Sequence, residues 1–215
     1  MRWPSAGAIA ALSPLPAGYR YAQFGRADIA PLIASLKEWH PRIAVGVNSC
    51  YLREDFYLKR VGLDGDLDRD VMVIRILSGE GTVGFWSFER EVDSLGIWGR
   101  LLVVAPEHRG TRVSAAALAG SEVIGRVMGA AFIYAFAPLS TPHVQQGLER
   151  AGYRLLGFFP GRDREEVSPG VVKRVYQAVY AKLLVPEEQV HWPDPGKMTP
   201  RARQMYGLLF PERAG

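Results

Sequence analysis

The chain has little cysteine and histidine, which limits the metal and disulfide chemistry open to it. Cys50 is the only cysteine among 215 residues, so an internal disulfide and a structural zinc site built on cysteines are both excluded. The histidines, His40, His108, His143 and His191, are far apart and show no HxxxH spacing, so we expect no metal site. A reducing, cytoplasmic setting fits this composition.

The chain also lacks an apolar stretch long enough to cross a membrane. Its longest uncharged run, Val127–Leu148, contains Pro138 and Pro142, and the apolar part ends near Leu139, which is too short to span a bilayer. Residues 1–17 begin Met-Arg-Trp-Pro and loosely resemble a signal peptide, but prolines interrupt them and no leucine-rich centre follows. We therefore expect no membrane partner, and we predict that residues 1–17 are a flexible lead-in.

Charge of one sign is not concentrated anywhere in the chain. Lys and Arg number 26 against 22 Asp and Glu, a formal net charge of +4. This excess permits an anionic ligand, but it is spread along the sequence and forms no basic stripe of the kind that nucleic-acid binding needs. With 48% hydrophobic and 22% charged residues, the composition is that of a folded protein with a core rather than a disordered one.

Hydrophobic periodicity predicts an α/β (α+β) domain, a mixed sheet with helices on both faces. Strands are expected at Tyr19–Phe24, Val71–Leu77, Thr82–Glu89, Leu95–Ala105, Ala130–Ala137, Tyr153–Phe159 and Val172–Leu184. Helices are expected from Asp28 to just before Pro41, at about Cys50–Val61, at Thr111–Met128 and at Pro142–Ala151.

Composition divides the chain into three parts: the lead-in of residues 1–17, a domain of residues 18–185, and a proline-rich extension of residues 186–215. Thr199-Pro200 is a good start for a short helix within the extension. The extension carries Leu208, Leu209 and Phe210, which would be a liability if exposed on a monomer. We therefore predict that the extension packs against its own domain or against a neighbouring subunit. The second arrangement would make the protein a homodimer.

The clearest chemical signal lies between the strand that ends near Ala105 and the helix that follows. Residues 103–114 read Val-Val-Ala-Pro-Glu-His-Arg-Gly-Thr-Arg-Val-Ser. A strand that passes through a polar turn into a helix leaves backbone N–H groups without partners, and the helix dipole adds positive charge. Such a turn can bind a pyrophosphate, with Arg109 and Arg112 in support. The alternative is an ordinary turn in which Arg109 is solvated.

The stretch Val104-x-Pro106-Glu-His-Arg109-Gly110, with Ala151-Gly152-Tyr153 about forty residues later, resembles the GNAT (GCN5-related N-acetyltransferase) superfamily. Gly84-Phe85 stands where those proteins usually carry a Val-Gly-Phe strand, and the resemblance covers about Tyr19–Leu184. It implies a mixed, mostly antiparallel sheet flanked by helices on both faces. It also implies an acyl-CoA-dependent N-acyltransferase that uses acetyl-CoA, or another acyl-CoA, and transfers the acyl group by direct attack of an amine.

The resemblance further implies which residues contact the cosubstrate. The backbone of Leu102, Val103 and Val104 would pair with the pantetheine arm, and the loop Arg109, Gly110, Thr111, Arg112, Val113 and Ser114 would hold the pyrophosphate. Thr141 takes the place of an Asn at the start of the later helix. Arg112 and Ser114 replace glycine or alanine of the family pattern, and Leu148 replaces a tyrosine general acid. These departures keep an alternative open, a catalytically silent GNAT-like CoA-binding or regulatory module.

Acyl transfer to an amine also needs a base and a donor for the carbonyl oxygen. We consider His143, since histidine is the side chain most often used for proton transfer, and Glu91, near the turn after the second strand of the hairpin; the alternatives are a surface histidine and a solvated turn charge. Cys50 is expected to be a small buried hydrophobe, and Tyr134 a core residue with a bonded hydroxyl. The acceptor is a small-molecule or peptide amine: small amine, antibiotic, amino acid, peptide N-terminus and protein lysine all remain open.

Overall fold

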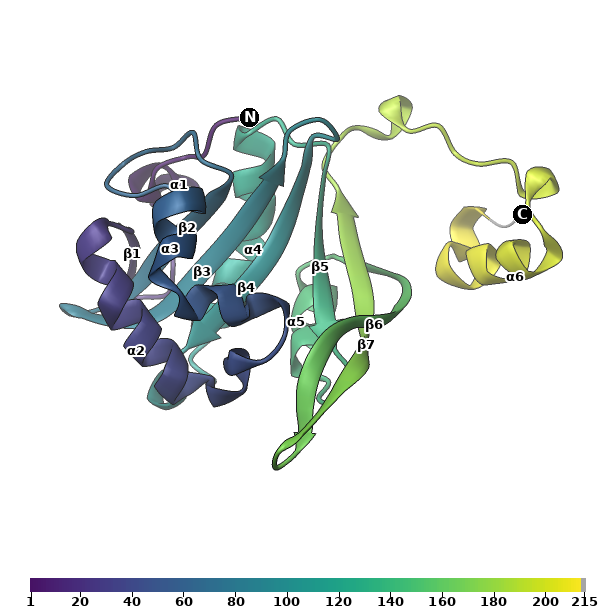
Figure 1. The fold of residues 1–215 in the computed structure, drawn as a ribbon. Helices are drawn as coiled ribbons and strands as arrows, with labels where there is room; N and C mark the ends of the chain where they lie inside the picture. The colour runs from purple at the N-terminus through teal and green to yellow at the C-terminus, as the bar shows by residue number, and fades with distance from the viewer. Residues whose placement is uncertain (214–215) are drawn as a thin grey trace. The chain divides into compact units, whose positions relative to one another are not determined.

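A seven-stranded sheet organises the first of two units in a computed structural model that describes residues 1–213 (Figure 1). The strands lie in the order β1-β2-β3-β4-β5-β7-β6, and every neighbouring pair is antiparallel except β4 and β5. Their bounds are β1 (Tyr19–Gln23), β2 (Val71–Ser78), β3 (Gly81–Glu91), β4 (Gly96–Val104), β5 (Phe132–Pro138), β6 (Arg154–Ser168) and β7 (Val171–Leu183). The predicted mixed, mostly antiparallel sheet is confirmed.

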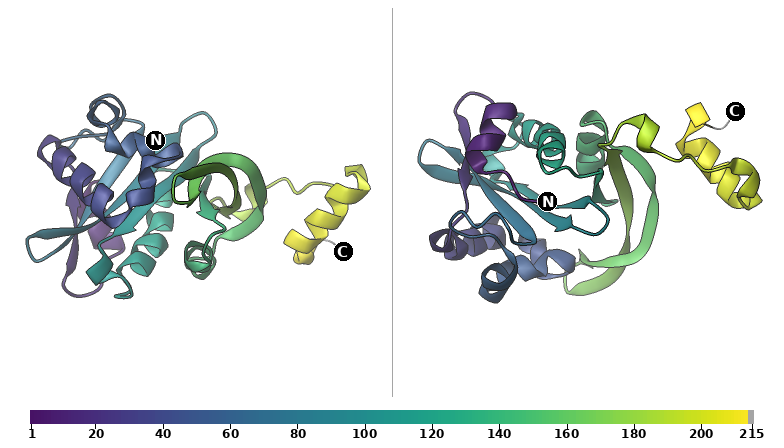
Figure 2. Two further views of the ribbon diagram at one scale, coloured as in Figure 1. Left: turned by 60° about the horizontal axis from the view of Figure 1, so that its bottom comes forward. Right: turned by 90° about the horizontal axis from the view of Figure 1, so that it is seen from above.

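Helices cover both faces of this sheet, as the sequence predicts (Figure 2). Along β2, Val71 and Val73 join one buried cluster while Met72 and Ile74 join the other, because successive side chains of a strand point to opposite faces. The first cluster holds the apolar side chains of α2 (Ile29–Trp39) and α3 (Glu54–Arg60). The second holds those of α1 (Ala6–Leu12), α4 (Val113–Val127) and α5 (His143–Arg150).

Residues 1–17, for which we predict a flexible lead-in, are instead folded against the sheet. Ser5 begins α1 by accepting a hydrogen bond from the N–H of Ala8, a favourable cap. Trp3 and Ile9 are 2% and 1% exposed, and the Trp3 indole N–H donates to the carbonyl of Arg69 at 2.8 Å. The prediction took the prolines as interruptions of regular structure. Pro4, however, lies just before the cap residue Ser5, so it does not interrupt α1.

The second predicted helix, about Cys50–Val61, is divided in two. A 3-10 helix spans Val47–Leu52, and α3 begins only at Glu54, after an extended Arg53. Tyr51, just before this break, packs against the sheet, and its hydroxyl lies 2.5 Å from the hydroxyl of Ser87 in β3. The segment that precedes α3 is therefore anchored directly to the middle of the sheet.

The β6–β7 hairpin is much longer than the predicted strand Tyr153–Phe159. β6 continues to Ser168 and curves toward the 3-10 helix at Val47–Leu52 (Figure 2). At the point of contact the N–H of Val47 donates to the Asp163 carboxylate at 2.8 Å. Residues 162–166 read Arg-Asp-Arg-Glu-Glu, and a strand without apolar side chains gives no periodic signal.

The second unit begins at Val185 and contains one α-helix, α6 (Pro200–Leu209). Thr199 caps it by accepting from the N–H of Ala202 at 3.3 Å, so the helix starts where Thr199-Pro200 predicts. In the same unit the rings of Tyr206 and Phe210 stack with centroids 5.0 Å apart. Dimerisation through this extension stays a prediction. Among the helices of residues 1–213, none is long and apolar enough to cross a membrane.

Candidate functional site

The parallel strands β4 and β5 pair over only part of their length. The register joins Gly96 to Phe132 and ends where Gly99 meets Ala135, so the two strands separate beyond these residues (Figure 1). β4 also carries a bulge: Ser87 of β3 faces Leu101 and Phe88 faces Gly99, which leaves Arg100 as the extra residue. The C-terminal half of β4 consequently has an open edge on the side of β5.

The register with β3 shows which backbone groups of β4 face this gap. The N–H of Ala105 donates to the carbonyl of Val83 at 2.8 Å, which makes Gly84 and Val104 a non-hydrogen-bonded pair. The N–H and C=O groups of Val104, and of Leu102 two residues before it, therefore point away from β3 and into the gap. Those of Val103 are directed to β3. Leu102 and Val104 thus turn their backbone groups away from β3, and the Val104 carbonyl accepts from Arg109; that these residues and Val103 pair with pantetheine stays a prediction.

The loop after β4 leads straight into α4 with its backbone N–H groups exposed. Gly110 has φ +82° and Arg112 has φ +68°, and no side chain caps the helix. Within residues 1–213, no acceptor is found for the N–H groups of Gly110, Thr111, Arg112, Val113 and Ser114. Because α4 begins here, its dipole adds positive charge to the same place.

Arg112 adopts the left-handed conformation that the resembling family assigns to glycine. A residue with a Cβ pays about 1 kcal/mol or more for this backbone, and such strain is concentrated at functional sites. The Arg112 residue is exposed, so it adds a solvated cation to the loop. Ser114 is half-buried on the first turn of α4.

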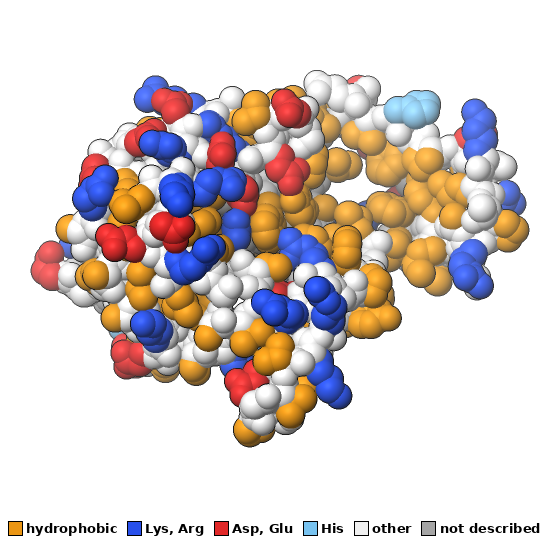
Figure 3. Space-filling model, in the orientation of Figure 1, with side chains coloured by type: hydrophobic (Ala, Val, Ile, Leu, Met, Phe, Trp, Pro, Cys, Tyr) orange, Lys and Arg blue, Asp and Glu red, His pale blue; other side chains and the backbone are white. Residues whose placement is uncertain are grey.

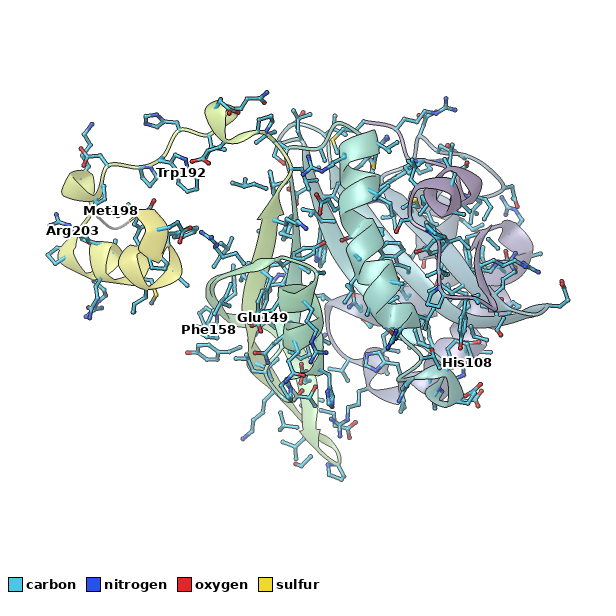
Figure 4. The ribbon with its side chains drawn as sticks, turned by 180° about the vertical axis from the view of Figure 1, so that it is seen from behind. His108, Glu149, Phe158, Trp192, Met198 and Arg203 are labelled. Carbon is cyan, nitrogen blue, oxygen red and sulfur yellow. The ribbon has the colours of Figure 1, made fainter. Side chains whose placement is uncertain are left out.

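The side chains of His108 and Arg109 hold the loop in place. The Arg109 guanidinium donates to the carbonyls of Val104 at 3.1 Å and Trp39 at 2.9 Å. The His108 Nδ1 lies 3.0 Å from the Tyr19 hydroxyl, beside the N-terminal end of α4 (Figure 4). Arg109 thus ties the loop to β4 and to the end of α2, and its support of a pyrophosphate stays a prediction.

His40 follows Trp39 at the end of α2, close to the loop. The pKa of His40 is lowered because the imidazole is partly removed from water, and because the Arg109 and Arg42 guanidinium groups disfavour its protonation. The Trp39 ring lies against Phe85 of β3, with centroids 5.9 Å apart. The end of α2 therefore lies beside the loop.

The two candidate catalytic residues lie in different parts of the domain. His143 is the exposed first residue of α5, and α5 follows β5 at the end where β4 and β5 separate. Glu91 pairs with Gly96 at the other end of β4, and its carboxylate accepts hydrogen bonds from the Tyr134 hydroxyl and the Ser94 hydroxyl. The structure does not bring them together, and the catalytic role of each stays a prediction.

The other residues singled out from the sequence have simple environments. The Tyr134 hydroxyl is bonded to Glu91, as expected, but Tyr134 is only half-buried and belongs to neither core cluster. Leu148 is 2% exposed in the core, so no tyrosine acid stands at this position. Thr141 is exposed before α5, and its carbonyl accepts from Gln145 at 3.2 Å. Burial raises the pKa of the half-buried Cys50 thiol, which keeps it protonated and argues against a nucleophilic role.

Sequence reasoning missed a group of side chains on the α2/α3 face of the sheet, which we call the Trp98 cluster: Trp98, Arg100, Phe136 and Arg162. The guanidinium carbons of Arg100 and Arg162 lie 4.4 and 4.6 Å from the Trp98 ring centroid. That of Arg162 lies 3.6 Å from the Phe136 centroid. Arg100 comes from the β4 bulge and Arg162 from β6, so only the tertiary fold places them together at the gap.

No protein-family model and no curated protein sequence matches the chain. Solved structures do match in fold. The dodecameric spermidine N-acetyltransferase of Vibrio cholerae has a TM-score of 0.61 at 12% identity, covering 78% of this chain and 94% of that one. An aminoglycoside 6'-acetyltransferase type Ii has a TM-score of 0.55 at 17% identity, with 78% and 98% covered. The chain therefore has the fold of the GNAT acetyltransferases.

Proposed function

We propose, from the GNAT fold of this chain, that the protein is an acyl-CoA-dependent N-acyltransferase that transfers an acetyl group from acetyl-CoA to an amine. The observation that carries the proposal is that the open edge of β4 is followed directly along the chain by a loop whose Gly110–Ser114 N–H groups have no acceptor among residues 1–213. A thioester with a long polar arm and a diphosphate needs such an edge and such a loop, one after the other.

The chain's own groups divide the work as follows. The loop N–H groups bind the diphosphate, and the Leu102 and Val104 backbone groups align the pantetheine arm along β4. This places the thioester where β4 and β5 separate, and an N–H of Leu102 or Val104 stabilises the negative charge that develops on its carbonyl oxygen. The amine attacks the carbonyl carbon directly, its C–N bond forms, and the C–S bond breaks to release the CoA thiol.

The base that accepts the proton of the attacking amine does not come from β4, because Gly96–Val104 contains no carboxylate. We propose His143 as the base, since α5 starts at the open end of the gap. Glu91 is the second candidate, acting from the paired end of β4 through Tyr134, to which its carboxylate is bonded. With Leu148 buried, the departing thiolate takes its proton from water.

The proposal is tested by calorimetric titration with acetyl-CoA and with CoA, followed by thiol release in the presence of a panel of amines. We expect binding of both and thiol release with at least one amine. Binding without thiol release from any amine or acyl-CoA would support the silent binding module instead. Absence of heat at millimolar acetyl-CoA would overturn the assignment of the loop altogether.

Gly110→Ala is expected to weaken acetyl-CoA binding about tenfold or more. A Cβ at Gly110 meets nothing within 4 Å, so the methyl group would enter the open space that the diphosphate needs. The positive φ also costs about 1 kcal/mol of folding stability for a residue with a Cβ. The measurement is the acetyl-CoA dissociation constant, alongside denaturant unfolding.

Gly79→Ala is the matched control. Gly79 has φ +57° in the β2–β3 turn, and its Cβ likewise meets nothing within 4 Å. It should lose a similar amount of stability with no change in acetyl-CoA affinity. Equal affinities in the two variants would place the diphosphate elsewhere.

A further inference from the structure

Several unsatisfied polar atoms gather at the gap between β4 and β5, on the face that carries the Trp98 cluster. Four buried side-chain atoms there have no hydrogen-bond partner within the described residues: Nε of Arg100, Nη1 of Arg162, Oδ1 of Asn48 and Oε1 of Gln177. Buried polar groups are normally paired, because an unpaired one destabilises the folded state. Their concentration at one place points to a ligand that pairs with them.

Two irregularities of the sheet direct the arginines to this place. Arg100 is the extra residue of the β4 bulge. Arg162 comes from a second irregularity, because β6 advances from Phe159 to Asp163 while β7 moves only from Gln177 to Val175. Bulges re-aim side chains, often next to active sites, and here they bring two guanidinium groups to the ring of Trp98.

The two arginines differ in how their charges are balanced. Arg100 is 9% exposed and forms an ion pair with Glu89, which also pairs with Arg60 at 2.7 Å. Arg162 is partly buried and forms neither an ion pair nor a hydrogen bond within residues 1–213. Burial lowers its pKa, but the guanidinium is still charged at neutral pH. A partly buried cation that no carboxylate contacts directly among the described residues can bind an anionic partner.

The nearest carboxylate along the chain, that of Asp163, partly offsets the effect of burial on the Arg162 pKa, but its hydrogen bonds go elsewhere. The Asp163 side chain accepts from the N–H of Val47 at 2.8 Å and from the amide of Gln177 at 3.2 Å. These bonds join the hairpin to the 3-10 helix at Val47–Leu52, from which Asn48 donates to the carbonyl of Arg100 at 3.3 Å. Both amide side chains are thus fixed, and each presents an oxygen that lacks a donor.

The unpaired groups are of two kinds, donors on the arginines and acceptors on the amides, with aromatic rings between them. We propose that this site selects, as the acceptor of the acetyl group, an amine that also carries a carboxylate. Its carboxylate pairs with the fork of Arg162, and its amine N–H groups face the oxygens of Asn48 and Gln177. Lys and Arg side chains on the hairpin (Figure 3) attract such an anionic group. The inference rests on the proposed acetyl transfer.

The test compares amino acids with the amines formed by their decarboxylation, for example phenylalanine with 2-phenylethylamine, in the wild type and in Arg162→Gln. We expect the wild type to prefer the carboxylated member. In Arg162→Gln, kcat/KM for that member should fall about 10- to 100-fold, the usual worth of a charged hydrogen bond. The value for the plain amine should stay within about twofold. Arg162→Lys, which keeps the charge but not the fork, should recover only part of the loss.

Arg164→Gln is the matched control, an exposed arginine two residues further along β6, and it should leave both substrates unchanged. An equal loss for both members of each pair would show a merely structural role for Arg162 and overturn the inference. So would a panel in which only amines without a carboxylate are acetylated. A preference for amines that carry phosphate would overturn the choice of carboxylate.

Calorimetry separates this inference from the proposed function. Phenylalanine and its N-acetyl product are titrated into the wild type and Arg162→Gln, with and without CoA. If neither acetyl-CoA nor CoA binds but the carboxylates bind in an Arg162-dependent manner, the anion site stands and the acyltransferase proposal falls. If acetyl-CoA binds and plain amines are acetylated while the carboxylates give no heat, the site falls and the acyltransferase stands.

Discussion

Glu89→Ala is expected to lower the free energy of unfolding by about 3 kcal/mol, because it leaves the buried Arg100 guanidinium without its counter-charge. The Arg100 and Glu89 side chains are 9% and 19% exposed, so water cannot replace the lost carboxylate at full strength. Among residues 1–213, the other side-chain hydrogen-bond partner of the Arg100 guanidinium is Cys50, whose sulfur lies 3.4 Å from Nη2. The measurement is urea unfolding at neutral pH, with the fluorescence of the chain's tryptophans as probe.

The control is Glu80→Ala, which also removes a carboxylate that pairs with an arginine, but from an exposed turn. Glu80 pairs with Arg20 at 3.1 Å, but its side chain is 96% exposed, and exposed pairs contribute about 0–1 kcal/mol. Glu89→Gln keeps the shape and part of the hydrogen bonding, so it should lie between the two alanine variants. If Glu89→Ala cost no more than Glu80→Ala, the ion pair would not be holding Arg100 in the Trp98 cluster.

Most of the sheet could be predicted because its strands carry local signals. β2 and β3 are joined by a glycine-containing turn between apolar runs, and β4 has the dense apolar core of a central strand. α4 shows a stripe of small and apolar residues at helical spacing, including Ala117 and Ile124, which are fully buried. In each case the pattern lies within one segment, and the hydrophobic effect acts on that segment in the same way whatever its neighbours are.

The candidate site could be predicted only in its backbone. Pro106, Arg109 and Gly110 mark the loop, and the structure shows unpartnered N–H groups there. The destination of the Arg109 side chain, at the carbonyls of Val104 and Trp39, depends on a contact 70 residues away in sequence, which no local pattern encodes. Solvated and structural arginines look identical in a sequence.

The Trp98 cluster escaped prediction for a related reason. Its members come from β4, β5 and the irregular middle of β6, and their convergence depends on two register shifts. A register shift changes which face a side chain occupies, so strict alternation gives the wrong face for the residues beyond it. The charged run at residues 162–166 also hid the strand itself.

Trp3→Ala is expected to destabilise the domain by about 3 kcal/mol or more, since it empties a large buried site at the N-terminus. Trp3 is 2% exposed, packs 6.4 Å from Phe88 between ring centroids, and donates its indole N–H to the carbonyl of Arg69. A flexible lead-in, as the sequence suggested, would make the same substitution almost neutral. Denaturant unfolding of the full chain therefore distinguishes an anchored N-terminal segment from a flexible one, because the expected folding equilibrium constants of the variant differ by a factor of about 100.

Leu12→Ala supplies the comparison within the same segment. Leu12 is the last residue of α1 and is 60% exposed, so its truncation should change the free energy of unfolding by no more than about 0.5 kcal/mol. A large loss in Trp3→Ala with none in Leu12→Ala means that the N-terminal segment is anchored by its apolar side chains. The segment packs closely against α4: a Cβ built on Gly120 of this helix would lie only 2.9 Å from the Ser13 hydroxyl oxygen. The N-terminal segment therefore covers the face of the sheet that carries α4. The position of the loop at the start of α4 is then stabilised by residues that lie more than a hundred positions before it, and loss of Trp3 should loosen acetyl-CoA binding as well as the fold.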